Sequence, residues 1–194
     1  MTIYTSRGSM MILLNSLIQP CMFTVISNNV GITHGLIKLG NGANRIMTTG
    51  NNGGSSEYSE ALSIELFNRL VGLNLVKTET EMKVAEGPLL DYAAMYNNAL
   101  TVGVSVTRAV AFNRPYTKYD ADKLLKRKLN AMVKANQGIQ IDKYILHIWT
   151  QSGKTASIVK RITRKYAKDY KDVIVLISIV NTDSIFFNKY PLRS

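Results

Sequence analysis

The chain has 194 residues, of which 46% are hydrophobic and 19% charged, so its composition favours one globular domain and excludes a disordered chain. Lys and Arg outnumber Asp and Glu by 24 to 13, and the resulting charge of +11 favours a polyanion as partner, nucleic acid before an acidic membrane surface. The single cysteine, Cys21, excludes an intramolecular disulfide framework and a CxxC metal cluster, and it favours an intracellular, reducing compartment.

Residues 1–56 are predicted to form an N-terminal extension that ends in a linker. Polar residues interrupt the apolar residues 10–26, which fall short of the roughly 20 continuous apolar residues that a membrane-spanning helix needs. We therefore expect a peripheral strand or short helix that packs on the domain or docks on a neighbouring protein chain, and not a membrane segment. Residues 40–56 contain five glycines and four asparagines, a composition that predicts a linker.

A helix is predicted over residues 57–71, with Ser55 and Ser56 available as caps and Gly72 at its end. A first strand is predicted over residues 73–84, whose Thr-Glu-Thr-Glu tract indicates an exposed edge or outer end. The sequence Gly-Pro that follows turns the chain into the next element.

Two alternating arms joined by asparagines predict a β-hairpin over residues 89–109. Asp91 is the single acid of the first arm, and Ser105 and Thr107 are on one face of the second arm. A three-residue loop of Asn97, Asn98 and Ala99 would place Asp91 opposite Ser105, whereas a two-residue loop would point them to opposite faces.

At these residues the chain resembles the PD-(D/E)XK, or restriction-endonuclease-like, superfamily. That family carries one Asp on a first strand and a (D/E)-x-K triplet on the next, preceded by an apolar-Gly-Val run. Asp91 matches the first acid, and residues 102–104 (Val-Gly-Val) match the run into the triplet. Ser105 and Thr107 stand where the family has its second acid and its lysine. The resemblance also implies a metal-binding glutamate on the first helix, for which Glu60 is the nearest match and Glu57 the alternative. A solvated helix face would equally explain both acids.

The order of the remaining elements agrees with this resemblance. A basic helix is predicted over residues 121–136, a strand over 144–150, a second basic helix over 155–170 and a buried apolar strand over 173–180. The expected fold is therefore α/β, a mixed sheet with an αβββαβ core plus a C-terminal αβ unit, in a domain over residues 57–194.

The resemblance implies phosphodiester cleavage, in which carboxylates hold a divalent ion and a cation or base assists the attacking water. Because Ser105 and Thr107 cannot replace an acid and an ammonium group, we expect a degenerate site and no cofactor. Mg²⁺ is expected, on Asp91 and Glu60, only if the enzyme is active. The favoured function is a catalytically degenerate nuclease-fold protein that binds DNA or RNA or acts structurally in a nucleoprotein assembly.

The expected phosphate contacts are six cations of the two basic helices: Lys126, Arg127, Lys160, Arg161, Arg164 and Lys165. Two alternatives stay open. One is an active, divergent metal-dependent nuclease, and the other is a structural protein that docks through its uncharged segment at residues 10–26.

Overall fold

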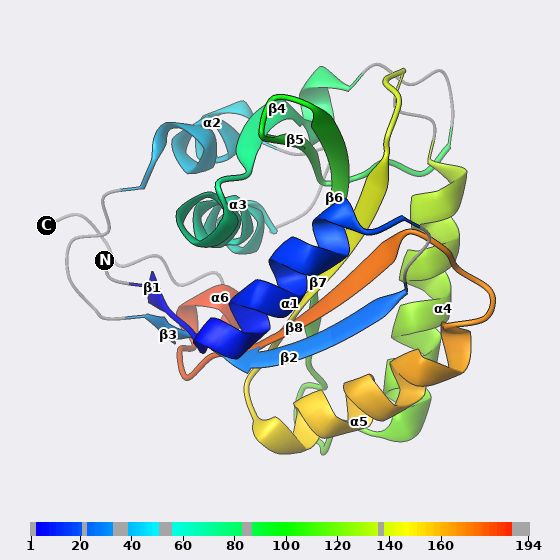
Figure 1. The fold of residues 1–194 in the computed structure, drawn as a ribbon. Helices are drawn as coiled ribbons and strands as arrows, with labels where there is room; N and C mark the ends of the chain where they lie inside the picture. Colours follow the sequence, from blue (N-terminus) through cyan, green and yellow to red (C-terminus); the bar gives the residue numbers. More distant parts are fainter. Residues whose placement is uncertain are drawn as a thin grey trace, which may run out of the picture.

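The centre of the fold is a six-stranded sheet between two layers of helices (Figure 1). The structure is a computed structural model, and it describes residues 3–20, 23–32, 39–50, 56–82, 87–135 and 138–187. β5 is antiparallel to both of its neighbours, β4 and β6, whereas β6, β7, β8 and β2 run parallel to one another. The strands are, in sheet order, β2 (Thr24–Asn29), β8 (Val173–Ile179), β7 (Lys143–Thr150), β6 (Leu100–Ala109), β5 (Tyr92–Tyr96) and β4 (Asn74–Thr78). A separate antiparallel pair is formed by β1 (Ile3–Tyr4) and β3 (Gly31–Ile32).

The helices divide between the two faces of the sheet (Figure 1). One face is covered by α1 (Arg7–Ile18), α2 (Asn41–Thr49), α3 (Glu57–Val71) and α6 (Ser184–Phe187). The other is covered by α4 (Lys118–Lys134) and α5 (Gly153–Thr163). Two short 3₁₀ helices, η1 (Glu79–Glu81) and η2 (Arg164–Tyr166), follow β4 and α5.

Strand alternation distributes the core between these faces. On β6, Val104 packs toward α3, and on β7, Trp149 does the same. The intervening residues of β7, such as Leu146, pack with Leu125 and Leu129 of α4 on the other face. Apolar side chains on both faces are what a sheet covered by helices on each side requires.

The α/β class and the mixed sheet are confirmed, and the helix predicted over residues 57–71 has the predicted bounds. The strand predicted over 73–84 is shorter, because β4 ends at Thr78, where a capping box with Glu81 begins η1. The second basic helix begins at Gly153, and its last predicted turns are η2 and irregular backbone.

The N-terminal residues pack against the same sheet. α1 buries Leu13 and Leu17 against it, and β2 extends it as an edge strand parallel to β8. The described N-terminal residues therefore form a helix packed on the sheet and an edge strand of that sheet. No helix in the described ranges is long and apolar enough to cross a membrane.

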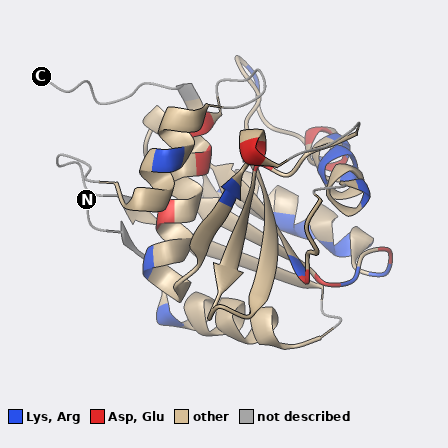
Figure 2. Ribbon diagram, turned by 90° about the horizontal axis from the view of Figure 1, so that it is seen from above, with Lys and Arg blue, Asp and Glu red and all other residues tan. Residues whose placement is uncertain are grey.

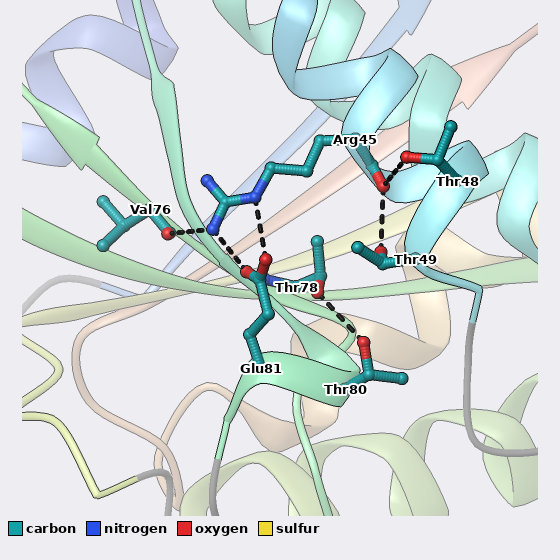
Figure 3. A network of polar contacts seen from close by, with 7 residues as sticks. All are labelled: Arg45, Thr48, Thr49, Val76, Thr78, Thr80 and Glu81. Atoms are coloured by element: carbon teal, nitrogen blue, oxygen red, sulfur yellow. Dashed lines mark hydrogen bonds and ion pairs between the residues drawn. The ribbon is translucent and has the colours of Figure 1, made fainter.

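The prediction of a linker over residues 40–56 is wrong for Asn41–Thr49, which form α2; residues 51–55 are outside the described part of the chain. Ala43 and Ile46 give this polar segment an apolar side, and both are buried. Arg45 then fixes α2 to the end of β4 (Figure 3). Its guanidinium donates to both carboxylate oxygens of Glu81, at 2.9 and 2.5 Å, and to the carbonyl of Val76 at 3.2 Å.

Candidate functional site

The hairpin register places Asp91 opposite Ser105. Tyr96 pairs with Leu100, so Asn97, Asn98 and Ala99 form the three-residue loop that the prediction required. Asn97 and Asn98 have φ of 48° and 55°, a left-handed conformation that asparagine adopts more readily than most residues. The predicted pairing of Asp91 with Ser105 is confirmed.

Gly103 explains the apolar-Gly-Val run that precedes Ser105. A Cβ atom at Gly103 would lie 2.5 Å from Cδ1 of Leu90 and 3.1 Å from Cγ2 of Ile141. Leu90 is fully buried in this position, directly before Asp91. The glycine therefore lets the chain entering β5 approach β6 closely, which brings the carboxylate of Asp91 to Ser105.

The Asp91 carboxylate is held by three protein groups. Its Oδ2 accepts hydrogen bonds from Ser105 Oγ at 2.8 Å and from the backbone N–H of Val106 at 2.6 Å. Lys128 Nζ lies 3.6 Å from the same oxygen and donates to Ser105 Oγ at 3.1 Å. The Asp91 side chain is 17% exposed, so the group is accessible from one side. Thr107 is two residues further along β6 and lines a small cavity beside α4.

Lys128 places an ammonium group beside Asp91, whereas residues 105–107 contain none. It comes from α4 and not from the strand, so inspection of the triplet missed it. A signal was nevertheless present: Lys128 is three residues after Leu125 and four before Met132, which places it beside the buried stripe of the helix. A lysine at such a position points along the core and not directly into solvent, and its side chain is 22% exposed.

Glu60 is the second acid of the site, and it is 2% exposed. Its Oε1 has no hydrogen-bond partner among the described residues. Burial, and then the charge of Asp91, raises the pKa of Glu60 to about 7, against a hydrogen bond from Ser56 that lowers it. Glu57, the alternative, is half-buried in the first turn of α3. The solvated-face explanation is thus wrong for Glu60.

Asp91 and Glu60 are the residues that would hold a metal ion. The described residues contain no group of three or more His, Cys, Asp or Glu side chains arranged for a metal. Two carboxylates still fit Mg²⁺, which commonly binds one or two carboxylates together with water and substrate phosphates. The partnerless Oε1 of Glu60 agrees with that donor set.

A chain of buried hydrogen bonds holds α3 in place over the sheet. Ser63 Oγ bonds to Tyr92 Oη at 2.8 Å and to His147 Nδ1 at 2.7 Å. His147 Nε2 bonds in turn to Ser178 Oγ at 2.9 Å. Burial lowers the pKa of His147 to about 3, so the ring is neutral at physiological pH. Because Ser63 is one turn from Glu60, this network fixes the helix that presents the acid.

The six cations predicted to contact phosphate all lie on the α4–α5 layer, and all except the half-buried Lys160 are exposed. Tyr166 Oη donates to Asp122 Oδ1 at 3.1 Å and Tyr170 Oη to Asn130 Oδ1 at 2.5 Å, which holds the end of α5 against α4. Figure 2 shows basic residues of α4 and α5 on one side of the sheet and the acids of α3 on the other. We call the layer formed by residues 118–134 and 153–166 the basic surface.

Comparison with known proteins adds little to this geometry. No family model matches the chain, and no solved structure matches it. The chain is similar to the Dictyostelium discoideum protein named AAC-rich mRNA clone AAC4 protein. The two are 39% identical over 132 residues, which cover 62% of this chain and 19% of that protein. The chain therefore spans about a fifth of the length of this relative, whose name states no activity.

Three large apolar side chains of α1 are exposed to solvent. Met11 is 56% exposed, Ile12 51% and Ile18 63%. Docking of another protein chain through residues 10–26 stays a prediction.

Proposed function

We propose that this chain is a nuclease-fold protein that binds nucleic acid through its basic surface, alone or within a nucleoprotein assembly. The observation that carries the proposal is the charge of two adjacent helices on one face of the sheet. α4 carries six Lys and Arg residues against two Asp, and α5 with η2 carries five against none. The layer on the other face of the sheet carries no such excess along α3.

Local pairing does not cancel this charge. Of the two acids of α4, Asp120 is paired with Arg114, outside the helix, through two bonds of 2.6 Å. Asp122 accepts a hydrogen bond from Tyr166. Clustered, exposed cations of this kind are the electrostatic footprint of proteins that contact phosphates, because binding releases the counterions of the nucleic acid.

The nuclease-fold part of the proposal is supported by the arrangement of the sheet and of the hairpin. Strands β4 to β8 follow one another in chain order across the sheet, with helices before β4, between β6 and β7, and between β7 and β8. Asp91 lies at the start of β5 and faces Ser105 on β6, as the resemblance to the PD-(D/E)XK superfamily implies.

The test is fluorescence anisotropy with labelled 20-mers of single- and double-stranded DNA and RNA. We expect binding at about 50 mM salt that weakens by at least tenfold at about 200 mM, as phosphate contacts require. A neutral protein of similar size serves as the control for nonspecific adsorption. Absence of binding to all four probes at low salt would refute the proposal.

A second candidate function is metal-dependent phosphodiester hydrolysis, and Lys128 is the observation that favours it. The structure brings an ammonium group within 3.6 Å of Asp91, and one oxygen of the nearby Glu60 has no partner among the described residues. A Mg²⁺ ion held by Asp91 and Glu60 would polarise the phosphate and lower the pKa of bound water. Lys128 would supply positive charge for the developing negative charge on the phosphate oxygens.

This second candidate predicts cleavage of labelled oligonucleotides in Mn²⁺ or Mg²⁺ that falls by at least about a hundredfold in Asp91→Asn and in Lys128→Gln. Arg7→Gln, in α1 and outside the basic surface, is the control and should cleave like wild type. If the wild type cleaves none of the four substrates, hydrolysis is excluded and binding remains. Cleavage that survives in Lys128→Gln would remove the role given to that ammonium group.

A further inference from the structure

A cavity of about 270 Å³ lies where the end of β6 meets the first half of α4. Thr107 and Arg108 line it from β6, Lys123 and Arg127 from α4, and Tyr116 from the loop between them. Its volume is just below the usual range for drug-sized ligands, so it suits a small group such as a phosphate. It is a separate place from the Asp91 carboxylate, two residues or about 7 Å further along the strand.

The hydroxyl of Tyr116 is the feature that calls for a ligand. Its Oη is buried and has no hydrogen-bond partner among the described residues. A buried hydroxyl without a partner costs free energy, and such groups in folded proteins call for an explanation. Burial, and then the Asp120 carboxylate, raises the pKa of Tyr116, so the phenol keeps its proton and can donate a hydrogen bond to an anion.

The charges around this hydroxyl favour an anion. Lys123 and Arg127 are exposed at the cavity and pair with no carboxylate in the described part of the chain. Among the described residues that line the cavity, Asp120 is the one acid, and Arg114 neutralises it through two hydrogen bonds. Thr117 also donates two hydrogen bonds to the Asp120 carboxylate, from the Thr117 hydroxyl at 2.7 Å and from the Thr117 N–H at 2.9 Å.

We propose that this cavity binds one phosphodiester group of the bound strand, with Tyr116 Oη donating to a phosphate oxygen and Lys123 and Arg127 supplying the charge. The inference rests on the proposed nucleic-acid binding and adds a defined subsite to it. A phosphate held there would seat the strand beside Asp91, Ser105 and Lys128 and, as a phosphate contact, would help to fix its register on the protein.

The test compares Tyr116→Phe with wild type in oligonucleotide binding, thermal melting and salt dependence. We expect about tenfold weaker binding, because one hydrogen bond to a charged group is lost, and an unchanged salt slope, because no charge is lost. The variant should melt at the same temperature as wild type or higher, since the lost hydroxyl has no hydrogen-bond partner among the described residues. Tyr119→Phe is the matched control, because Tyr119 is 74% exposed in the first turn of α4.

A second variant and a second probe keep the outcomes apart. Lys123→Gln should weaken oligonucleotide binding and lower the salt slope by about one, while Arg7→Gln, in α1 and outside the basic surface, leaves the affinity nearly unchanged. Inorganic phosphate, followed by amide NMR shifts, should perturb residues 106–110 and 116 in wild type and not in Tyr116→Phe.

Equal oligonucleotide affinity of wild type and Tyr116→Phe would overturn the subsite while leaving nucleic-acid binding intact. If that equality is accompanied by a phosphate response lost in Tyr116→Phe, the cavity holds a small phosphorylated molecule and the strand assignment is wrong. Failure of the wild type to bind any oligonucleotide would refute the proposed function itself, and with it the assignment of the cavity to a strand.

Discussion

Replacing Glu60 with glutamine is expected to stabilise the protein by about 2–3 kcal/mol above pH 7. The native state holds Glu60 with a pKa of about 7, whereas its ordinary value is 4.5. Between these two values the native state keeps a proton that the unfolded chain has released, so the wild type loses stability as the pH rises through this window. Above pH 7 the buried carboxylate is ionised and the full penalty applies; below pH 4.5 it disappears.

Urea unfolding of wild type and Glu60→Gln at pH 5 and pH 8 measures this difference. Glu57→Gln, on the same helix and half-buried, is the control and should show little pH-dependent gain. Asp91→Ala should have the opposite sign and cost about 1–3 kcal/mol, because it leaves the N–H of Val106 and the Ser105 hydroxyl without their acceptor. Equal stabilities of wild type and Glu60→Gln at both pH values would contradict the assigned burial and coupling of Glu60.

Neutralising the basic surface is expected to weaken nucleic-acid binding by two to three orders of magnitude at about 50 mM salt. The variant replaces six cations with glutamine, a change that removes charge and retains polarity: Lys126, Arg127, Lys160, Arg161, Arg164 and Lys165. Five of the six are exposed and none completes the buried core, so the thermal melting temperature should change little. Anisotropy with duplex DNA and single-stranded RNA measures the loss.

A matched control removes cations from elsewhere on the protein. Arg7 lies in α1, on the other face of the sheet, and Lys77 lies in β4, at the far edge. The double variant Arg7→Gln, Lys77→Gln should bind within about threefold of wild type, because neither residue belongs to the basic surface. A loss equal to that of a pair from α4, such as Lys126 and Arg127, would show that net charge and not this surface determines affinity.

The hairpin could be predicted in detail from sequence, because its register depends on local information. Alternation sets which residues share a face, and Asn97 and Asn98 adopt the left-handed backbone of the loop that brings Asp91 to Ser105. The end of the helix at residues 57–71 is equally local, since the left-handed Gly72 marks it, whereas Ser56 makes no side-chain cap at its start. These features do not depend on how distant segments pack.

The features that could not be predicted from the sequence depend on tertiary packing. Lys128 reaches Asp91 only because α4 returns antiparallel along β6, and no inspection of the 105–107 triplet reveals that approach. α2 has a linker-like composition, and its stability comes from buried Ala43 and Ile46 and from the contact of Arg45 with Glu81. The burial of Tyr116 Oη without a partner among the described residues likewise follows from the packing of the loop before α4.

The most direct test of the central claim is the salt dependence of duplex binding by wild type and by the six-residue variant. Plots of log Kobs against log salt concentration should be linear, and the wild type should be steeper by about five, since each engaged cation contributes about 0.9. That result would place the phosphate contacts on α4, α5 and η2. Parallel lines for the two proteins, or wild-type binding that does not change with salt, would contradict the proposal that this surface binds nucleic acid.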